Sequence, residues 1–296
     1  MLKRTLFFGN PFHLSTRYKQ LVMTDKEAGE EKTVPVEDIG FIVFEHPQIT
    51  FTQSVIQLLA ENNTAVVFCD DKHHPNSMLL HLDTHTIQAE LFRHQVAASE
   101  PLKKQLWQQT IKAKIKNQAL HLDLQQRDGQ ALHYMAGKVK SGDNTGLEAQ
   151  AARKYWPRLF VANFTRDRYG AAPNPALNYG YAILRAAVAR ALAGSGLLAT
   201  LGIHHHNRYN AFALADDIME PYRPYVDMAV MDMMEEGLDV ADLGKPEKAF
   251  LLTILTLDVQ IGRNKRPLMV ALSYTTASLA RCFSGDGKKI LYPLLQ

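Results

Sequence analysis

The residues best suited to do chemistry lie between Gly202 and Pro221, in the stretch GIHHHNRYNAFALADDIMEP. Three consecutive histidines precede an apolar-periodic run that ends in Asp216, Asp217 and Glu220. Asp217 and Glu220 are three residues apart, so on a helix they share a face beside the apolar stripe. A carboxylate there costs free energy unless it is paired or binds a cation. Imidazole and carboxylate groups together are ligands for Mg²⁺, Mn²⁺ or Zn²⁺, so the stretch indicates a metal site.

A purely structural explanation covers the same stretch. Acidic residues on the margin of a helix are usually solvated or paired with arginine, and Arg223 is a candidate partner. Histidine runs also occur in loops without a function. Three neighbouring histidines cannot all bind one metal, because their side chains diverge. The stretch alone leaves both interpretations open.

A second acidic residue stands in a basic segment. The run GLEAQAARKYWPRLF places Glu148 at the start of a predicted helix. Basic residues follow it at Arg153, Arg158, Arg166 and Arg168. Residues 138–168 hold seven Lys/Arg against three Asp/Glu, a setting that suits a metal that meets a polyanion. Complementarity of Glu148 to the helix dipole and a solvated basic face explain the pattern equally well.

A lysine-rich segment precedes this one. The run PLKKQLWQQTIKAKIKNQ, residues 101–118, has five lysines and no acid. Lys112 and Lys116 share a helical face, with Trp107 nearby. Lysine gives phosphate contacts that carry affinity without reading bases, so these residues are candidates for binding DNA. A solubilising surface is the alternative.

The elements that must position these residues fall into two groups. The chain before about residue 72 consists of short β-branched or aromatic runs separated by turn residues. The runs occupy residues 4–9, 18–24, 32–36, 38–44 and 64–70. Their spacing predicts a small antiparallel sandwich. Residues 52–61 interrupt the series, because their apolar residues recur at helical spacing after Thr52.

The polar stretch CDDKHHPNS is the expected linker, at about residues 70–77. It divides a β-sandwich domain, residues 1–72, from a helical domain, residues 73–296. Beyond it the apolar period changes from that of strands to that of helices. Helices are expected at 86–122 with a break at 99–101, at 147–160, 174–194, the end of 202–221, 224–238, 246–260 and 266–285.

Length and composition are those of a globular protein. A chain of 296 residues with a hydrophobic fraction of 46% predicts about two domains with real cores. Residues 1–75 hold seven Lys/Arg against ten Asp/Glu, and residues 76–296 hold 26 against 20. The net charges are therefore −3 and +6, so the second part would carry the contact with an acidic polymer.

The compartment is expected to be the cytoplasm. Two cysteines in a chain of this length do not form a disulfide framework. The basic and then apolar N-terminus is not a signal peptide, because its apolar part is short and is broken by Gly9, Asn10 and Pro11. No run approaches the length that spans a membrane, so no membrane contact is expected.

Several of these segments together resemble one known family. They are KRTLFFGNP, GLEAQAARKYW, NYGYAILRAAVARALAGSGL, LGIHHHNRYNAFALADDIMEPYRPYVD and RPLMVALSYTTASLARCF. In this order they resemble the CRISPR-associated integrase and endonuclease of spacer acquisition, the universal adaptation protein. The compact length and the N-terminus resemble the version found beside type II, single-effector systems.

The resemblance implies a fold and a ligand set. The family fold is an N-terminal β-sandwich followed by an all-helical catalytic domain. Its glutamate ligand, in the pattern E-x-x-A-A-R, falls on Glu148. Its acidic ligand, in the pattern D-x-x-E, falls on Glu220, with Asp217 one turn before it as a further candidate. Its histidine falls on His205, but the triple histidine departs from the family pattern, so His204 is the alternative.

The resemblance also implies a reaction. The family joins a DNA 3′-hydroxyl to a phosphodiester of the CRISPR array, a transesterification that a cation assists by offsetting developing negative charge. A site of Glu148, His205 and Glu220 would hold Mg²⁺ or Mn²⁺. With water as the nucleophile the same site would act as an endonuclease.

The implied partners are protein and DNA. The family forms a homodimer through its β domains, and two such dimers are bridged by a small CRISPR-associated adaptation protein. The DNA partners are double-stranded protospacer DNA and CRISPR repeat DNA. The type II context adds contact with the effector nuclease.

Two other functions are consistent with parts of the sequence. A DNA-binding scaffold of the adaptation complex with a non-catalytic metal site would share the basic surface but tolerate loss of Glu148 or Glu220. A metallohydrolase of small molecules is the third, and the lysine-rich segments argue weakly against it.

Overall fold

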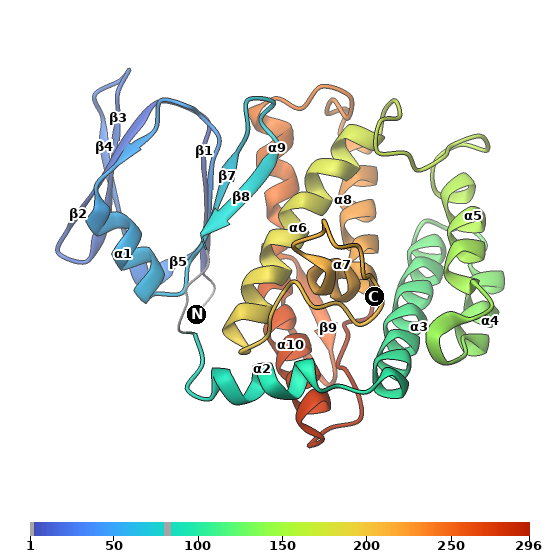
Figure 1. Ribbon diagram of the computed structural model, residues 1–296. Helices are drawn as coiled ribbons and strands as arrows, with labels where there is room; N and C mark the ends of the chain where they lie inside the picture. Colours follow the sequence, from blue (N-terminus) through green and yellow to red (C-terminus); the bar gives the residue numbers. More distant parts are fainter. Residues whose placement is uncertain (1–2, 80–83) are drawn as a thin grey trace. The chain divides into compact units, whose positions relative to one another are not determined.

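The computed structural model describes residues 3–79 and 84–296 and divides the chain into two compact units (Figure 1). The first unit is Met1–Thr84 and the second is His85–Gln296. Strands build the first unit, and helices build most of the second. The predicted fold class, a β-sandwich domain followed by a helical domain, is therefore confirmed.

Two four-stranded sheets form the first unit, with the orders β1-β5-β7-β8 and β4-β3-β2-β6. The strands are β1 Arg4–Phe8, β2 Phe12–Arg17, β3 Gln20–Asp25, β4 Glu31–Pro35, β5 Ile39–Phe44, β6 Thr50–Phe51, β7 Ala65–Cys69 and β8 Pro75–Leu79. Both sheets and helix α1 (Gln53–Glu61) contribute to one apolar core, which includes Leu14, Leu21, Ile42 and Val66. This shared core makes the two sheets a sandwich.

The expectation of a wholly antiparallel sandwich is wrong for both sheets. In the β4-β3-β2-β6 sheet, β6 pairs with β2 in parallel, and the β1-β5-β7-β8 sheet departs further. Strands β1, β5 and β7 are parallel, and only β8 is antiparallel to its neighbour. Parallel neighbours need a crossover connection, and α1 provides it between β5 and β7. All six residues of β5 are buried, as is typical of a central parallel strand covered on both faces.

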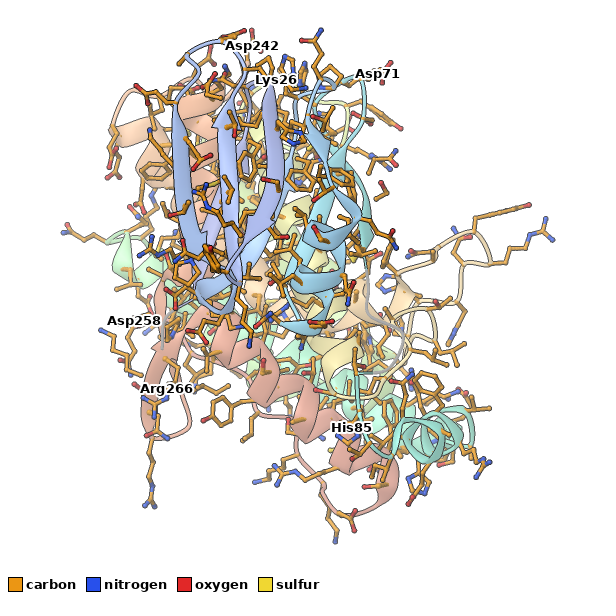
Figure 2. The ribbon with its side chains drawn as sticks, turned by 90° about the vertical axis from the view of Figure 1, so that its left-hand side faces the viewer. Lys26, Asp71, His85, Asp242, Asp258 and Arg266 are labelled. Atoms are coloured by element: carbon orange, nitrogen blue, oxygen red, sulfur yellow. The ribbon has the colours of Figure 1, made fainter. Side chains whose placement is uncertain are left out.

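The expected linker at about 70–77 and the boundary after residue 72 are also corrected. Strand β8 pairs with β7, so the preceding residues form a hairpin turn instead of a linker. The Asp70 carboxylate fixes this turn by accepting hydrogen bonds from the N–H groups of Lys72 and His74, at 3.0 and 2.9 Å. Figure 2 shows Asp71 of this turn and Lys26, next to β3, at the same end of the strands.

Helices α2 to α10 and one hairpin make up the described part of the second unit. The helices are α2 Gln88–Val96, α3 Glu100–Leu124, α4 Gln130–Lys138, α5 Leu147–Leu159, α6 Asn174–Gly194, α7 Ala213–Met219, α8 Arg223–Glu235, α9 Lys245–Leu252 and α10 Leu268–Ser284. A single 3₁₀ turn, η3 (Glu220–Tyr222), joins α7 to α8. Helix α6 packs against α7, α8, α9 and α10, and α3 packs against α4, α5 and η3 (Figure 1).

The helical unit is not entirely helical, because the predicted helix at 246–260 ends early. Helix α9 is followed by a 3₁₀ turn and then by the antiparallel hairpin of β9 (Asp258–Ile261) and β10 (Asn264–Pro267). β-Branched residues in this stretch favour a strand, and Gly262, at φ +59°, supplies the left-handed backbone of the tight turn. Arg266 of this hairpin extends into solvent (Figure 2).

No helix among residues 3–79 and 84–296 is both long and apolar enough to cross a membrane.

Candidate functional site

Two of the predicted site residues, Glu148 and Glu220, come from separate elements of the second unit. Helix α5 starts at Leu147, where both carboxylate oxygens of Asp143 accept hydrogen bonds from the N–H groups of Leu147 and Glu148, each at 2.9 Å. This cap satisfies two free donors of the first turn and fixes Glu148 at the helix start. Glu220 opens η3, directly after α7.

The ammonium group of Lys114, on α3, joins the two glutamates. Lys114 Nζ lies 2.6 Å from an oxygen of Glu148 and 2.6 Å from Oε2 of Glu220. Arg223 Nε donates to the other oxygen of Glu220 at 2.8 Å. Glu220 is therefore paired with two cations, one at each carboxylate oxygen.

These charges shift one another's pKa values. Burial tends to raise the pKa of Glu220, but the charges of Arg223 and Lys114 outweigh it and lower this pKa below its usual value. Burial tends to lower the pKa of Lys114, but the carboxylates of Glu220 and Glu148 outweigh it and raise this pKa. Lys114 and Glu220 are therefore both ionised at neutral pH, although Glu220 is only 4% exposed.

Asp217 of α7 holds in place the loop that carries His204, His205 and His206, called the histidine loop below. This carboxylate is fully buried and accepts hydrogen bonds from the backbone N–H groups of Ile203, His204 and His205, at 2.7, 2.9 and 3.3 Å. It also contacts His205 Nδ1 at 2.5 Å. Asp217 therefore orients His205, and its role as a further metal ligand stays a prediction.

The ring of His205 is left with one nitrogen for other partners. The hydrogen bond to Asp217 raises the pKa of His205, burial opposes this increase, and the charges of Asp217 and Glu220 add to it. A histidine bound to a carboxylate through Nδ1 presents Nε2 to a metal or a substrate. The side chain is 46% exposed.

The histidine loop can approach Asp217 this closely only because residue 202 is a glycine. A Cβ atom at this position would lie 2.4 Å from the carbonyl oxygen of His205 and 2.8 Å from Oδ2 of Asp217. Neither distance is tolerable, and one of the atoms belongs to the backbone. The glycine before the histidines is therefore required by space.

The other two histidines have different surroundings. The His204 ring stacks on Trp107 of α3, with ring centroids 4.1 Å apart and planes 4° apart. Trp107 itself is 1% exposed and also meets His205 edge-on, at 5.8 Å. His206 is exposed. The side chains diverge as the sequence predicts, and His205 is the one that the Asp217 carboxylate holds through its ring.

Buried polar contacts fix the elements that carry the site. The Asn117 amide, on α3, donates to the carbonyl oxygens of Pro221 and Pro293, at 2.7 and 3.1 Å, and accepts from Leu295 N–H at 3.2 Å. It thereby joins α3, η3 and residues 293–295. At the other end of the histidine loop, Asp216 pairs with Arg185 of α6 at 2.6 Å.

A second buried network lies beside Glu220. Asp227 of α8 accepts hydrogen bonds from the hydroxyls of Tyr155, at 2.9 Å, and Tyr181. Tyr155 in turn contacts His121 Nδ1 at 2.7 Å. Burial raises the pKa of Asp227 to about 6. Asp227 and Glu220 line the same pocket of about 240 Å³, with Lys114, Arg166 and Arg223.

The donor set can be tested for its fit to a divalent cation. In the described ranges, no three His, Cys, Asp or Glu side chains already lie in an arrangement that holds a metal ion. However, two carboxylates converge on one cation, the Lys114 ammonium. Oxygen donors are those that Mg²⁺ and Mn²⁺ prefer, so the residues fit such an ion.

The predicted DNA-binding residues lie on α3, α5 and the loop that follows α5. Lys116, Arg153 and Arg168 are exposed, whereas Lys112, Arg158 and Arg166 are half-buried. None of the six forms an ion pair with an Asp or Glu that the structure describes. Arg166 is nevertheless engaged, because it donates to Asn174 and Asn178, at 2.8 and 2.6 Å.

Sequence reasoning missed the role of Lys114, which it counted only among the five lysines of a basic face. The missed signal was periodic, because Lys114 falls on the stripe that carries Ile111, Ile115 and Gln118, all of which are buried. Trp107, counted as a neighbour of the lysines, belongs to the same buried face. Glu220 does pair with Arg223, as the structural explanation proposed. Its carboxylate also converges with that of Glu148 on Lys114.

Comparisons with known proteins show which family and fold the chain resembles. The family model described as CRISPR associated protein Cas1 matches residues 7–256. The chain is 38% identical over 280 residues to the CRISPR-associated endonuclease Cas1 of Neisseria meningitidis serogroup C (strain 8013). That match covers 94% of this chain and 91% of the relative.

Two solved structures share the fold. One is a casposase bound to an integration product, with a TM-score of 0.81 and 21% identity, covering 98% of this chain and 92% of that one. The other is a chain of a Cas6-RT-Cas1–Cas2 complex, with a TM-score of 0.74 and 18% identity, covering 99% of this chain and 36% of that one. At these identities the likeness concerns the fold alone.

Proposed function

Because the chain belongs to the Cas1 family of CRISPR-associated proteins, we propose that it is a metal-dependent DNA integrase and endonuclease that inserts new spacers into a CRISPR array. The observation that carries the proposal is the convergence of Glu148 and Glu220, from α5 and η3, on one cation position. His205, presented by Asp217, is the third proposed ligand.

The chain's own residues would bind and orient the reacting groups. Glu148, Glu220 and His205 Nε2 would hold Mg²⁺ or Mn²⁺, which when bound supplies Lewis-acid stabilisation of a phosphate oxygen and a lower pKa for the attacking hydroxyl. Asp217 keeps the His205 ring in one orientation. Arg166 and Arg223 line the pocket beside Glu220 and would attract phosphate oxygens of the DNA strand.

The test is an integration assay on a supercoiled plasmid that carries CRISPR repeats, with and without EDTA. We expect EDTA, Glu148→Ala, His205→Ala and Glu220→Ala each to abolish strand transfer while the protein stays folded by circular dichroism. His206→Ala should retain activity, and His204→Ala should retain most of it. A dead His204→Ala beside an active His205→Ala would move the ligand by one position. Near-normal integration by Glu220→Ala would refute the site.

A DNA-binding scaffold with a non-catalytic site is the second candidate. The observation that favours it is Lys114, whose ammonium group neutralises both glutamates without a metal. If the protein is a scaffold, the wild type and the Glu148→Ala and Glu220→Ala variants should bind DNA and partner proteins equally well. None of the three should catalyse integration. The same assay therefore separates the two functions, and integration at the repeat also separates both from a metallohydrolase of small molecules.

The proposed assembly follows the family. A homodimer through the β unit and a small partner of the Cas2 type are proposed, supported by the fold shared with a chain of a Cas6-RT-Cas1–Cas2 complex. The DNA partners are protospacer and repeat DNA, and the type II effector nuclease is a further proposed contact. Co-purification of a tagged chain with the candidate partner proteins tests these contacts directly.

A further inference from the structure

Lys114 occupies an unusual position for a lysine. It lies on the buried face of α3, between Ile111 and Ile115, and it is only 9% exposed. Lysines near a surface normally extend their charged end into water. A buried ammonium group is costly unless ionised partners compensate for its lost hydration. Here the compensation comes from two carboxylates, each 2.6 Å from Nζ.

Those two carboxylates are the proposed metal ligands, and no other cation among the described residues pairs with both. Arg223 contacts the opposite oxygen of Glu220 and forms no ion pair with Glu148. An Mg²⁺ ion binds carboxylate oxygens at roughly 2.0–2.1 Å, so it would take the space that Nζ now fills. Two cations cannot share that space, because both the steric overlap and the like charges oppose it.

We propose that Lys114 is a built-in counter-cation, which holds Glu148 and Glu220 together before metal binds and which a divalent cation must displace. The inference rests on the proposed function, because it takes these two glutamates as the ligands. Its consequence is that Lys114 lowers the metal affinity of the site. Metal binding is then coupled to a movement of the Lys114 side chain out of the space between the carboxylates.

The experiment measures Mn²⁺ binding to the full chain, by electron paramagnetic resonance of free Mn²⁺, without DNA. Lys114→Met removes the charge and keeps the length of the side chain. We expect its Kd for Mn²⁺ to fall by about tenfold or more, a change that equals about 1.4 kcal/mol. Lys104→Met, at an exposed position of α3 outside the predicted DNA-binding residues, should bind Mn²⁺ as the wild type does.

Thermal unfolding gives an independent reading. Without metal, Lys114→Met should melt at a lower temperature than the wild type, because two carboxylates then face each other without a cation. Saturating Mn²⁺ should raise its melting temperature by more than it raises that of the wild type. Lys114→Arg keeps the charge and should retain the weak wild-type affinity, and Lys114→Gln should tighten binding if the Met variant does not fold.

The outcomes separate the inference from the proposed function. Unchanged or weaker Mn²⁺ binding by both Lys114→Met and Lys114→Gln overturns the inference, and if Glu220→Gln still abolishes binding, the proposed metal site stands. Absence of binding in the wild type and in every variant overturns both. Tighter binding in the neutral variants, with wild-type affinity in Lys114→Arg and Lys104→Met, supports the inference.

Discussion

The two units of the molecule are stabilised by different kinds of core. In the first unit, side chains such as Ile42, Phe44 and Leu59 form a continuous apolar cluster. Of its described residues, only Glu45 and Thr64 are buried and polar. In the second unit, charged and polar side chains such as those of Lys114 and Asp217 are buried together with the apolar side chains of the helices.

The difference teaches where sequence can vary without loss of function. An apolar core depends on volume and buried area, so a swap of similar size is tolerated. A buried polar cluster depends on each partner, because removing one leaves another uncompensated in a low-dielectric interior. Mutations in the first unit should therefore change stability, and mutations in the second should change chemistry.

The largest expected effect on stability belongs to the β unit. Ile42 of β5 is fully buried in the apolar cluster, and Ile42→Ala should lower the free energy of unfolding by about 2–5 kcal/mol through reduced burial and a cavity. Denaturant titration measures this, and Ile42→Val, which should cost about 0.5–1.5 kcal/mol, is the graded control. Mn²⁺ affinity should not change, and a weaker affinity would show that the cores are coupled.

The next effect belongs to the histidine loop. Asp217→Asn replaces one acceptor oxygen by a donor that faces N–H groups of the loop and His205. We expect the rate of strand transfer to fall by about 10–100-fold, as for other groups that orient a metal ligand. The unfolding free energy should fall by about 1–3 kcal/mol. Single-turnover integration rates check the first effect, and an unaltered rate would remove Asp217 from its orienting role.

A smaller, pH-dependent effect belongs to Asp227. Burial raises its pKa from 3.8 to about 6, so the folded state binds this proton more tightly than the unfolded state does. Its contribution to stability therefore grows as pH falls through 6 toward 4 and is absent above pH 7. Asp227→Asn cannot titrate. Compared with this variant, the wild type should gain about 1 kcal/mol between pH 7.5 and pH 5 in denaturant titrations. A pH-independent difference would contradict the raised pKa.

The smallest effect concerns surface charge. If α3 meets DNA phosphates, replacing Lys112 and Lys116 by alanine should make the log–log slope of affinity against salt shallower, by roughly 0.7–0.9 for each phosphate that is no longer neutralised. Replacing Arg153 and Arg158 should act in the same way. The matched control is the replacement of Lys26 and Lys32 in the β unit, both exposed, which should leave the slope unchanged. Equal slopes in all variants would mean that DNA follows another path.

Sequence patterns predicted the helices and strands better than they predicted which of these elements pair or pack with each other. The start of α5 after Gly146 and the bounds of α6 from Asn174 to Gly194 follow from capping and periodicity, and both are present. The parallel pairing of β1, β5 and β7 was missed. The alternation of apolar and polar residues indicates which side chains are buried, but not whether the neighbouring strand is parallel or antiparallel. Strand β8 was missed because Pro75 and its polar neighbours are typical of turns, although they are tolerated on an edge strand.

The candidate site shows the same limit. Its three segments were identified from residue types, and Glu148 and Glu220 do converge in space. Their roles as metal ligands, and that of His205, remain predictions. Lys114 could not be assigned from its type, because a lysine suggests a surface until the stripe on which it lies is considered.

The hydrogen bonds of Asn117 have a consequence for the order of synthesis. This side chain joins α3 and η3 to Pro293 and Leu295, residues that the ribosome adds more than 170 positions later. A nascent chain can therefore form the β unit early, whereas the carboxylate cluster lacks this anchor until translation has passed residue 295. The support of the carboxylate cluster therefore depends on residues that are translated long after the β unit.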